Sequence, residues 1–290
     1  MPAIEIKNLK KYFGKVKAVN GISLAVEKGE IFGFLGPNGA GKTTTIRCMM
    51  DFIRPTEGKI GILGFDARKD SVELKKNIGY LSSDIYLYDK WTGQEHLDFA
   101  ASLKGKSPRL DSLIKRLDFN PKTKVKTLST GNKQKLNIIL ALLGNPEILI
   151  LDEPTRGLDP LLQNEIYAIL QDFQKEGKTI FLSSHNLPEV ERICGRVGII
   201  RQGKIAAVER IEDVKNKSMH TGHISFEGAF DKNDFLAEGF AITSENTNGF
   251  FFTIRGEINP FLNTLAKYRV KDFEIAHANL EDIFLTFYKE

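Results

Sequence analysis

The sequence predicts an α/β fold with a largely parallel sheet, followed by a small α+β domain. Up to about Val214, short apolar runs alternate with helix-like segments, an order typical of α/β domains. The apolar runs are continuous, as in parallel strands buried on both faces, and the clearest are Ile31–Leu35, Ile148–Leu151, Thr179–Ser183 and Val197–Ile200. The first thirty residues differ, because Ile4–Ile6 and Ile22–Val26 alternate apolar and polar side chains. This alternation predicts antiparallel strands with one exposed face.

The chain is predicted to divide into an α/β domain (residues 1–214), a polar linker (residues 215–222) and an accessory domain (residues 223–290). Helix-forming patterns between roughly Thr92 and Leu143 predict a helical insertion in the first domain. The accessory domain shows the order β-α-β-β-α-β of a ferredoxin-like fold, with elements at His223–Glu227, Lys232–Ala237, Phe240–Ser244, Phe250–Arg255, Pro260–Tyr268 and Lys271–Ala276. Asn248-Gly249 predicts a hairpin. A final helix would place four apolar side chains on one face: Leu280, Ile283, Phe284 and Phe287.

Composition limits the classes of function. Hydrophobic residues make up 41% of the 290 residues, enough for a substantial core. A net charge of +4 is too small to indicate a nucleic-acid partner, so none is expected. Cys48 and Cys194 lie in unrelated contexts and are expected to be buried free thiols. No apolar run approaches the roughly 20 residues of a membrane-spanning helix, so any membrane function would need a separate chain.

The strongest motif is a glycine-rich segment that matches G-x-x-x-x-G-K-[ST] and lies between a buried strand and an apolar helix. Its glycines let backbone N–H groups point at phosphate oxygens, and the helix adds the positive end of its dipole. Lys42 can then reach the β- and γ-phosphates of a nucleotide, and the Thr43 hydroxyl can bind Mg²⁺. The alternative is a glycine-rich turn with a surface lysine. The predicted binding segment comprises Gly36, Pro37, Asn38, Gly39, Ala40, Gly41, Lys42, Thr43 and Thr44.

Two carboxylates follow the buried run Ile148–Leu151. Asp152 is predicted to bind Mg²⁺ beside the glycine-rich loop, and Glu153 to orient and deprotonate the attacking water. Alone, an apolar strand that ends in Asp-Glu is common and often structural. Together with the phosphate-binding loop, it predicts hydrolysis of a nucleoside triphosphate.

The segment Leu128–Gln134, with Pro154, Gly157–Asp159 and His185, resembles the ABC ATPases from about Ala3 to Val214. This resemblance implies a P-loop ATPase core with an antiparallel β subdomain and a helical insertion. It also implies ATP and Mg²⁺ as ligands, enclosed between two head-to-tail copies. In the family's signature Leu-Ser-Gly-Gly-Gln, Thr130 and Asn132 replace the first Gly and the Gln.

The resemblance assigns further roles. Ser129 and Gly131 would contact the phosphates bound to the second copy. His185 would contact the γ-phosphate, although a histidine after a strand is otherwise more often a polar cap. Phe13, or its neighbour Tyr12, would stack on adenine, with core packing as the alternative. Asp159 would cross to the facing subunit.

One position departs from the family. Ser83 aligns with the residue, usually Gln, that senses Mg²⁺ and the attacking water, and Asp84 is an alternative. Tyr86 and Tyr88 match in position the surface that docks the membrane subunit, but they would serve equally well as core residues.

The resemblance implies a subunit at the cytoplasmic face of the membrane that powers separate permease chains. The segment Ala278–Leu285 resembles the tail of drug- and antibiotic-type exporters, which favours export. The alternative is a soluble ABC ATPase that is not coupled to transport.

Overall fold

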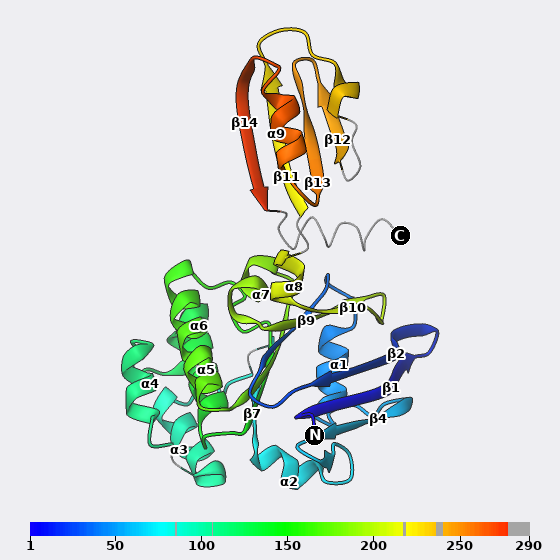
Figure 1. Cartoon of the computed structure of the whole chain (residues 1–290). Helices are drawn as coiled ribbons and strands as arrows, with labels where there is room; N and C mark the ends of the chain where they lie inside the picture. The colour runs from blue at the N-terminus through cyan, green and yellow to red at the C-terminus, as the bar shows by residue number, and fades with distance from the viewer. Residues whose placement is uncertain (85, 106, 217–218, 236–239, 278–290) are drawn as a thin grey trace. The chain divides into compact units, whose positions relative to one another are not determined.

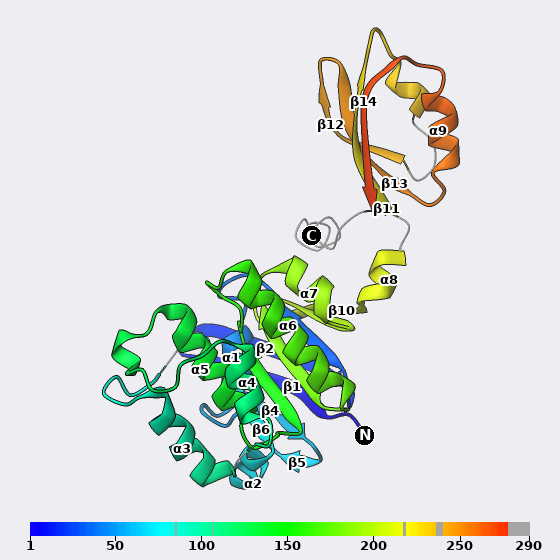
Figure 2. The ribbon, with the colours of Figure 1, turned by 90° about the vertical axis from the view of Figure 1, so that its left-hand side faces the viewer.

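The computed structural model describes residues 1–84, 86–105, 107–216, 219–235 and 240–277. The chain forms two compact units, Met1–Val208 and Glu209–Glu290 (Figures 1 and 2). This division falls a few residues before the predicted boundary at 214. The helix α8 (Ile211–Asn216) begins the second unit.

The main sheet of the first unit has the strand order β10-β9-β3-β8-β7-β6. The strands from β9 to β6 are parallel to their neighbours, as the continuous apolar runs predict. Because β3 pairs with β8 and β8 with β7, the carboxyl ends of these three strands lie side by side. The bounds are β3 (Ile31–Leu35), β6 (Ile78–Leu81), β7 (Ile148–Asp152), β8 (Thr179–Ser184), β9 (Arg196–Arg201) and β10 (Lys204–Arg210).

A second sheet of the first unit is antiparallel, with the order β2-β1-β4-β5. Its strands are β1 (Ile4–Phe13), β2 (Val16–Val26), β4 (Glu57–Ile62) and β5 (Phe65–Asp66). The helix α1 (Lys42–Met49) contacts β2 of this sheet and β7 of the main sheet. Its Ile46 and Met49 join Ile4, Phe34 and Ile150 in one buried cluster. The predicted antiparallel subdomain is confirmed.

Helices cover the other side of the main sheet, where α3, α4, α5 and α6 gather in Figure 1. Thr92 begins α3 with a capping box, since its side chain accepts from the Glu95 N–H and the Glu95 carboxylate accepts from the Thr92 N–H. The predicted helical insertion is confirmed. The helices of the first unit other than α1 are α2 (Ser71–Lys76), α3 (Gly93–Lys104), α4 (Leu110–Arg116), the 3₁₀ helix η1 (Val125–Thr127), α5 (Thr130–Leu142), α6 (Pro160–Lys175) and α7 (Leu187–Ile193).

The second unit has a four-stranded sheet with the order β12-β13-β11-β14, and all neighbouring strands are antiparallel. This is the strand arrangement of the split βαβ fold that the sequence predicts. Aromatic side chains, among them Phe250 and Phe252, fill the space between the sheet and its helices. The elements are β11 (Met219–Phe226), the 3₁₀ helix η2 (Lys232–Phe235), β12 (Phe240–Asn246), β13 (Gly249–Arg255), α9 (Asn259–Leu265) and β14 (Val270–His277).

Two details of the second unit differ from the prediction. The strand β11 begins at Met219, inside the range 215–222 predicted as a linker. Gly222, which suggested a linker, is needed for close strand packing, because a Cβ there would lie 2.2 Å from the Glu274 carbonyl oxygen. The helix predicted at Lys232–Ala237 is a 3₁₀ helix over Lys232–Phe235, and residues 236–237 lie outside the described residues. The final helix predicted around Leu280–Phe287 also lies outside them.

Candidate active site

The glycine-rich loop joins β3 to α1, as the motif predicts, and its glycines are required by close backbone contacts. A Cβ on Gly36 would lie 2.3 Å from the Ile200 carbonyl oxygen. Gly41 has a φ of 112°, and a Cβ there would lie 2.5 Å from the Ala18 carbonyl oxygen. Both positions therefore exclude other residues, and these close contacts fix the backbone path of the loop.

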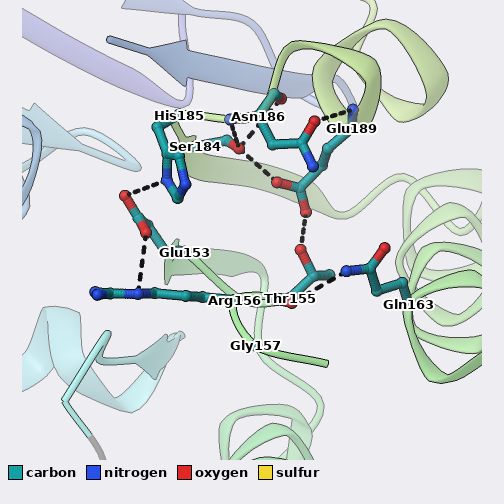
Figure 3. Close-up of a pocket in the computed structure, with 9 residues that line it drawn as sticks. All are labelled: Glu153, Thr155, Arg156, Gly157, Gln163, Ser184, His185, Asn186 and Glu189. Atoms are coloured by element: carbon teal, nitrogen blue, oxygen red, sulfur yellow. Dashed lines mark hydrogen bonds and ion pairs between the residues drawn. The ribbon is translucent and has the colours of Figure 1, made fainter. Parts of the chain in front are cut away.

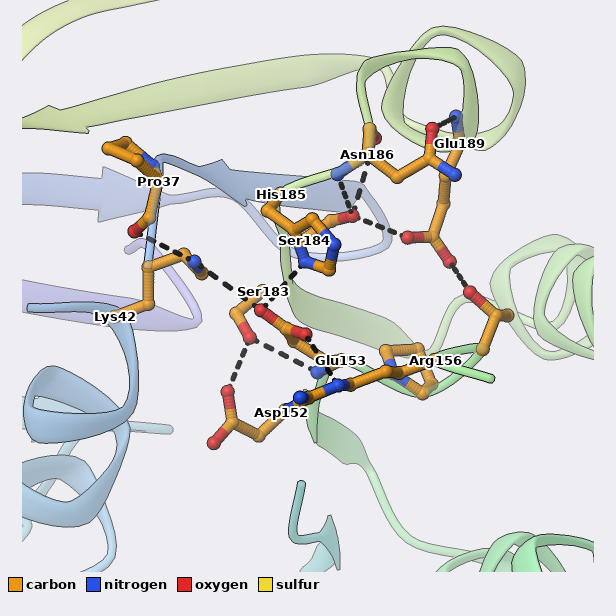
Figure 4. A network of polar contacts seen from close by, with 12 residues as sticks. Pro37, Lys42, Asp152, Glu153, Arg156, Ser183, Ser184, His185, Asn186 and Glu189 are labelled. Carbon is orange, nitrogen blue, oxygen red and sulfur yellow. Dashed lines mark hydrogen bonds and ion pairs between the residues drawn. The ribbon is translucent and has the colours of Figure 1, made fainter. Parts of the chain in front are cut away.

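Lys42 begins α1 and its side chain turns back into the loop. The side chain is 5% exposed, and Nζ donates to the carbonyl oxygens of Gly36, at 2.6 Å, and Pro37, at 3.2 Å. Nζ also lies 3.4 Å from Oε1 of Glu153 (Figure 4). The ammonium group thus joins the glycine-rich loop to the carboxyl end of β7.

The carboxyl end of β7 carries both predicted carboxylates. Asp152 is fully buried, and its Oδ1 accepts from the Ser183 hydroxyl at 2.5 Å. Glu153 has a φ of 51°, in the left-handed region that costs a non-glycine residue about 1–3 kcal/mol. Its backbone N–H donates to the carbonyl and the hydroxyl oxygen of Ser183, which stabilises this conformation. The neighbouring strand β8 therefore fixes the orientation of both acids.

His185 follows β8 and completes the group. Its Nδ1 lies 3.0 Å from Oε1 of Glu153, and its ring is 47% exposed. Arg156 approaches the other carboxylate oxygen, with 4.0 Å between Nε and Oε2. Lys42, Glu153 and His185, predicted separately, thus meet at one carboxylate oxygen. A buried carboxylate between a lysine and a histidine can accept a proton from a water bound beside it.

The acidic side chains fit a divalent cation. Asp152 Oδ2 and Glu153 Oε2 are buried and have no hydrogen-bond partner among the described residues. Hard cations such as Mg²⁺ prefer such carboxylate oxygens. Within the described ranges there is no group of three or more His, Cys, Asp or Glu that could hold a metal alone. The donor set therefore suits an ion that takes its remaining ligands from water, from Thr43 and from the phosphates of a nucleotide.

A pocket of about 120 Å³ extends from Glu153 along the residues that follow β7 and β8 (Figure 3). Glu189 on α7 is one of the residues that line it. The Glu189 side chain accepts from the Ser184 hydroxyl at 2.5 Å and from the Thr155 hydroxyl at 2.6 Å. Burial raises the pKa of Glu189, while these two hydrogen bonds lower it by a smaller amount. The pocket is lined by Glu153, Thr155, Arg156, Gly157, Gln163, Ser184, His185, Asn186 and Glu189.

The sequence motifs did not single out Ser183, Ser184, Thr155 or Glu189. Ser183 and Ser184 had a usable signal, since they are two hydroxyl residues at the carboxyl end of an otherwise apolar strand. Thr155 and Glu189 had no sequence signal that could have identified them.

The signature segment lies at the start of α5. Ser129 is the N-cap of this helix and is exposed, with its hydroxyl accepting from the Asn132 N–H at 3.3 Å. A Cβ on Gly131 would meet only the Leu158 side chain, at 4.0 Å. Gln134 Nε2 donates to the Pro154 carbonyl oxygen at 2.7 Å, so α5 is tied to the segment after Glu153.

The aromatic residues predicted to bind adenine or the membrane subunit differ in their exposure and hydrogen bonding. Phe13 is 50% exposed at the end of β1, and Lys11 Nζ lies 4.8 Å from the centre of its ring, whereas the Tyr12 hydroxyl donates to Asn20 Oδ1 at 2.9 Å. Tyr86 and Tyr88 are 84% and 65% exposed, which excludes core packing for both.

Ser83, which stands where the family usually has Gln, follows β6 and is half-buried. The neighbouring Asp84 carboxylate is exposed and pairs with Arg47, at 3.5 Å between Oδ2 and Nη2.

Comparisons with known proteins place this site in a family. The sequence profile for the ABC transporter family matches residues 19–156. The linearmycin resistance ATP-binding protein LnrL of Bacillus subtilis is 37% identical over 212 residues, which is 71% of this chain and 68% of that protein. The chain belongs to the ABC transporter family.

Two further matches agree. The bacitracin transport ATP-binding protein BcrA of Bacillus licheniformis is 39% identical over 74% of this chain and 72% of its own length. A solved structure of an ATP-binding subunit of an ABC transporter is 30% identical and superposes with a TM-score of 0.69, covering 73% of this chain and 92% of that one. The chain is an ABC ATPase that binds and hydrolyses ATP, and the alternative of an ATPase not coupled to transport is not favoured.

Two other expectations concern the cysteines and membrane-spanning helices. Cys48 and Cys194 are buried free thiols, as predicted, and burial raises the pKa of Cys48 to about 11. In the described part of the chain, no helix has the length and apolar character needed to cross a lipid bilayer.

Proposed function

We propose that this ABC ATPase drives an exporter by hydrolysing ATP with Glu153 as general base, in a site that two copies of the chain complete. The observation that carries the proposal is the meeting of Lys42, Glu153 and His185 beside the glycine-rich loop.

Each side chain has a role that follows from its contacts. Lys42 leaves the carbonyl oxygens of Gly36 and Pro37 and pairs with the β- and γ-phosphates of ATP. Glu153 then loses its cation and is free to take a proton from the attacking water. His185 holds the Glu153 carboxylate and lies where it can also contact the γ-phosphate. Mg²⁺, held by Asp152 and Thr43, would neutralise phosphate charge when bound.

Phe13 is proposed to stack on adenine, and the Gly36–Thr44 segment to bind the phosphates. Ser129 and Gly131 lie at an exposed helix start and are proposed to contact the phosphates held by a second copy in a head-to-tail dimer. A symmetric pair of this kind contains two identical composite sites.

Mixing two inactive variants tests this dimer. Lys42→Ala disables the site on its own chain, whereas Gly131→Glu places a negative charge in the site of the other chain. The fold accommodates a side chain at Gly131, since a Cβ there meets only Leu158 at 4.0 Å. An equal mixture should recover about a quarter of wild-type ATPase activity, because half of the dimers are mixed and each of these has one intact site. No recovery in verified mixed dimers would contradict the head-to-tail arrangement.

The partners are proposed to be separate permease chains, with this subunit peripheral at the cytoplasmic face of the membrane. Export is favoured by the similarity to LnrL, a linearmycin resistance protein. Loss of the chain should therefore increase sensitivity to at least one compound in a panel of antibiotics that includes linearmycin and bacitracin. Increased resistance on its loss would contradict export.

A further inference from the structure

Glu189 is a buried acid that the proposed catalytic roles leave without a function. It lies in the first turn of α7 and is only 4% exposed. No salt bridge of Glu189 with Lys or Arg is found among the described residues, and both of its oxygens accept hydrogen bonds from hydroxyl groups. A buried carboxylate is costly unless its hydrogen bonds are well formed, so this arrangement is expected to fix the groups around it.

The two hydroxyl donors belong to the segments that carry the catalytic groups. Ser184 immediately precedes His185, and its hydroxyl also accepts from the Asn186 N–H at 2.9 Å. Thr155 stands two residues after Glu153. The Glu189 carboxylate thus connects the turn that presents His185 to the turn that presents Glu153 (Figures 3 and 4).

Both turns need such a restraint. Glu153 is in a left-handed backbone conformation, and the His185 ring is nearly half exposed. The His185 ring is therefore not held by packing on all sides, and the backbone of Glu153 needs support from its neighbours. The 3.0 Å contact between them depends on the separation of the two turns.

We propose that Glu189 is a positioning residue for ATP hydrolysis: by holding Thr155 and Ser184 at a fixed separation, it keeps Glu153 and His185 in contact. This inference rests on the proposed role of Glu153 as general base. Because Thr155 also precedes Gly157–Asp159, the same carboxylate restrains the segment proposed to face the second copy.

The sharpest test removes one hydroxyl and keeps its volume. Thr155→Val loses the donor to Glu189, whereas Thr155→Ser keeps it. The matched control is Thr179→Val, since Thr179 is equally buried on β8 and its hydroxyl accepts from the Gly29 N–H at the opposite end of the strand. ATPase activity of the full chain is measured as kcat per nucleotide-binding site, together with the Kd for ATP and the thermal midpoint.

Thr155→Val should lower kcat by roughly 10- to 100-fold, the loss typical of a misplaced catalytic group, while the Kd for ATP changes less than about threefold. Thr155→Ser should restore kcat to near the wild-type value. Thr179→Val should lose comparable thermal stability and keep its kcat. Equal kcat values for Thr155→Val and Thr179→Val would overturn the proposal.

A second variant keeps the test usable if Thr155→Val does not fold. Ser184→Ala removes the other hydroxyl, and it should lower kcat in the same way with the Kd unchanged. Wild-type kcat in Ser184→Ala would overturn the proposal. Failure of the proposed function is a separate result, since a Glu153→Gln variant would then retain wild-type turnover whatever the Thr155 variants do.

Discussion

Replacing Lys42 by alanine should weaken ATP binding, and the contacts of Lys42 in the free protein limit the size of this loss. In the free protein the ammonium group is already satisfied by two carbonyl oxygens and Glu153. ATP binding therefore exchanges these contacts for stronger, charge-assisted contacts with phosphate, and the net gain is smaller than the full strength of the new bonds. A net loss of about 2–3 kcal/mol in the variant corresponds to a Kd roughly 30- to 150-fold weaker.

The assay is the thermal shift of the full chain with Mg²⁺ and a non-hydrolysable ATP analogue at 100 times the wild-type Kd. Wild type should be stabilised by about 2.7 kcal/mol, and the Lys42→Ala variant by only about 0.3–0.9 kcal/mol. At about 2–4 °C per kcal/mol, these values correspond to shifts of roughly 5–10 °C and 1–4 °C. Each protein is compared with its own ligand-free midpoint.

Lys178→Ala is the matched control. Lys178 is a second buried lysine, and its Nζ lies 2.8 Å from Glu147 Oε1, just before the amino end of β8 and so away from His185. This variant should lose stability but keep the full ligand shift. An undiminished shift in Lys42→Ala would refute the assignment of the glycine-rich loop as the nucleotide site.

Three other predictions concern Phe13, Ser83 and the pair Tyr86 and Tyr88. Phe13→Ala should weaken nucleotide binding by about 1–3 kcal/mol of lost stacking in a fluorescent-nucleotide titration, while Tyr12→Phe should have no effect; equal affinities of wild type and Phe13→Ala would argue against stacking. Ser83→Ala should lower ATPase turnover and Ser83→Gln should raise it, because a serine hydroxyl is short enough to need a bridging water to reach Mg²⁺ and the attacking water, whereas the longer amide reaches them directly. Asp84→Ala should leave turnover unchanged, since the Asp84 carboxylate pairs with Arg47. Equal rates for all of these proteins across a Mg²⁺ titration would exclude a role for Ser83. Tyr86→Ala and Tyr88→Ala should spare the isolated ATPase and reduce co-purification with the membrane partner, because both rings are exposed; unchanged co-purification would exclude them from the docking surface.

Much of the first unit could be predicted from the sequence because β3, β7 and β8 are buried on both faces. Such strands have continuous apolar runs, and their polar ends mark the edge where a site forms. Asp152 is the last residue of β7, Glu153 and His185 immediately follow strands, and Lys42 ends the glycine-rich loop. Parallel pairing of β3, β8 and β7 then brings them to the same edge.

The remaining features depend on tertiary packing. Glu189 stands two residues before Glu191, and the local pattern does not reveal which carboxylate is buried. Only the position of α7 against β8 places Glu189 between two hydroxyl groups. In the second unit, the start of β11 has no run of apolar side chains, so its sequence resembles a polar linker. It forms a strand because its backbone pairs with β13 and β14.

The role of Glu153 as general base is the central claim, and the Glu153→Gln variant tests it most directly. The amide keeps the shape and the hydrogen bonding of the side chain but cannot accept a proton from water. Steady-state turnover should fall by roughly 10²- to 10⁴-fold while ATP binding is retained, and size-exclusion chromatography with MgATP should show a stable dimer. Turnover within about threefold of wild type would contradict the account.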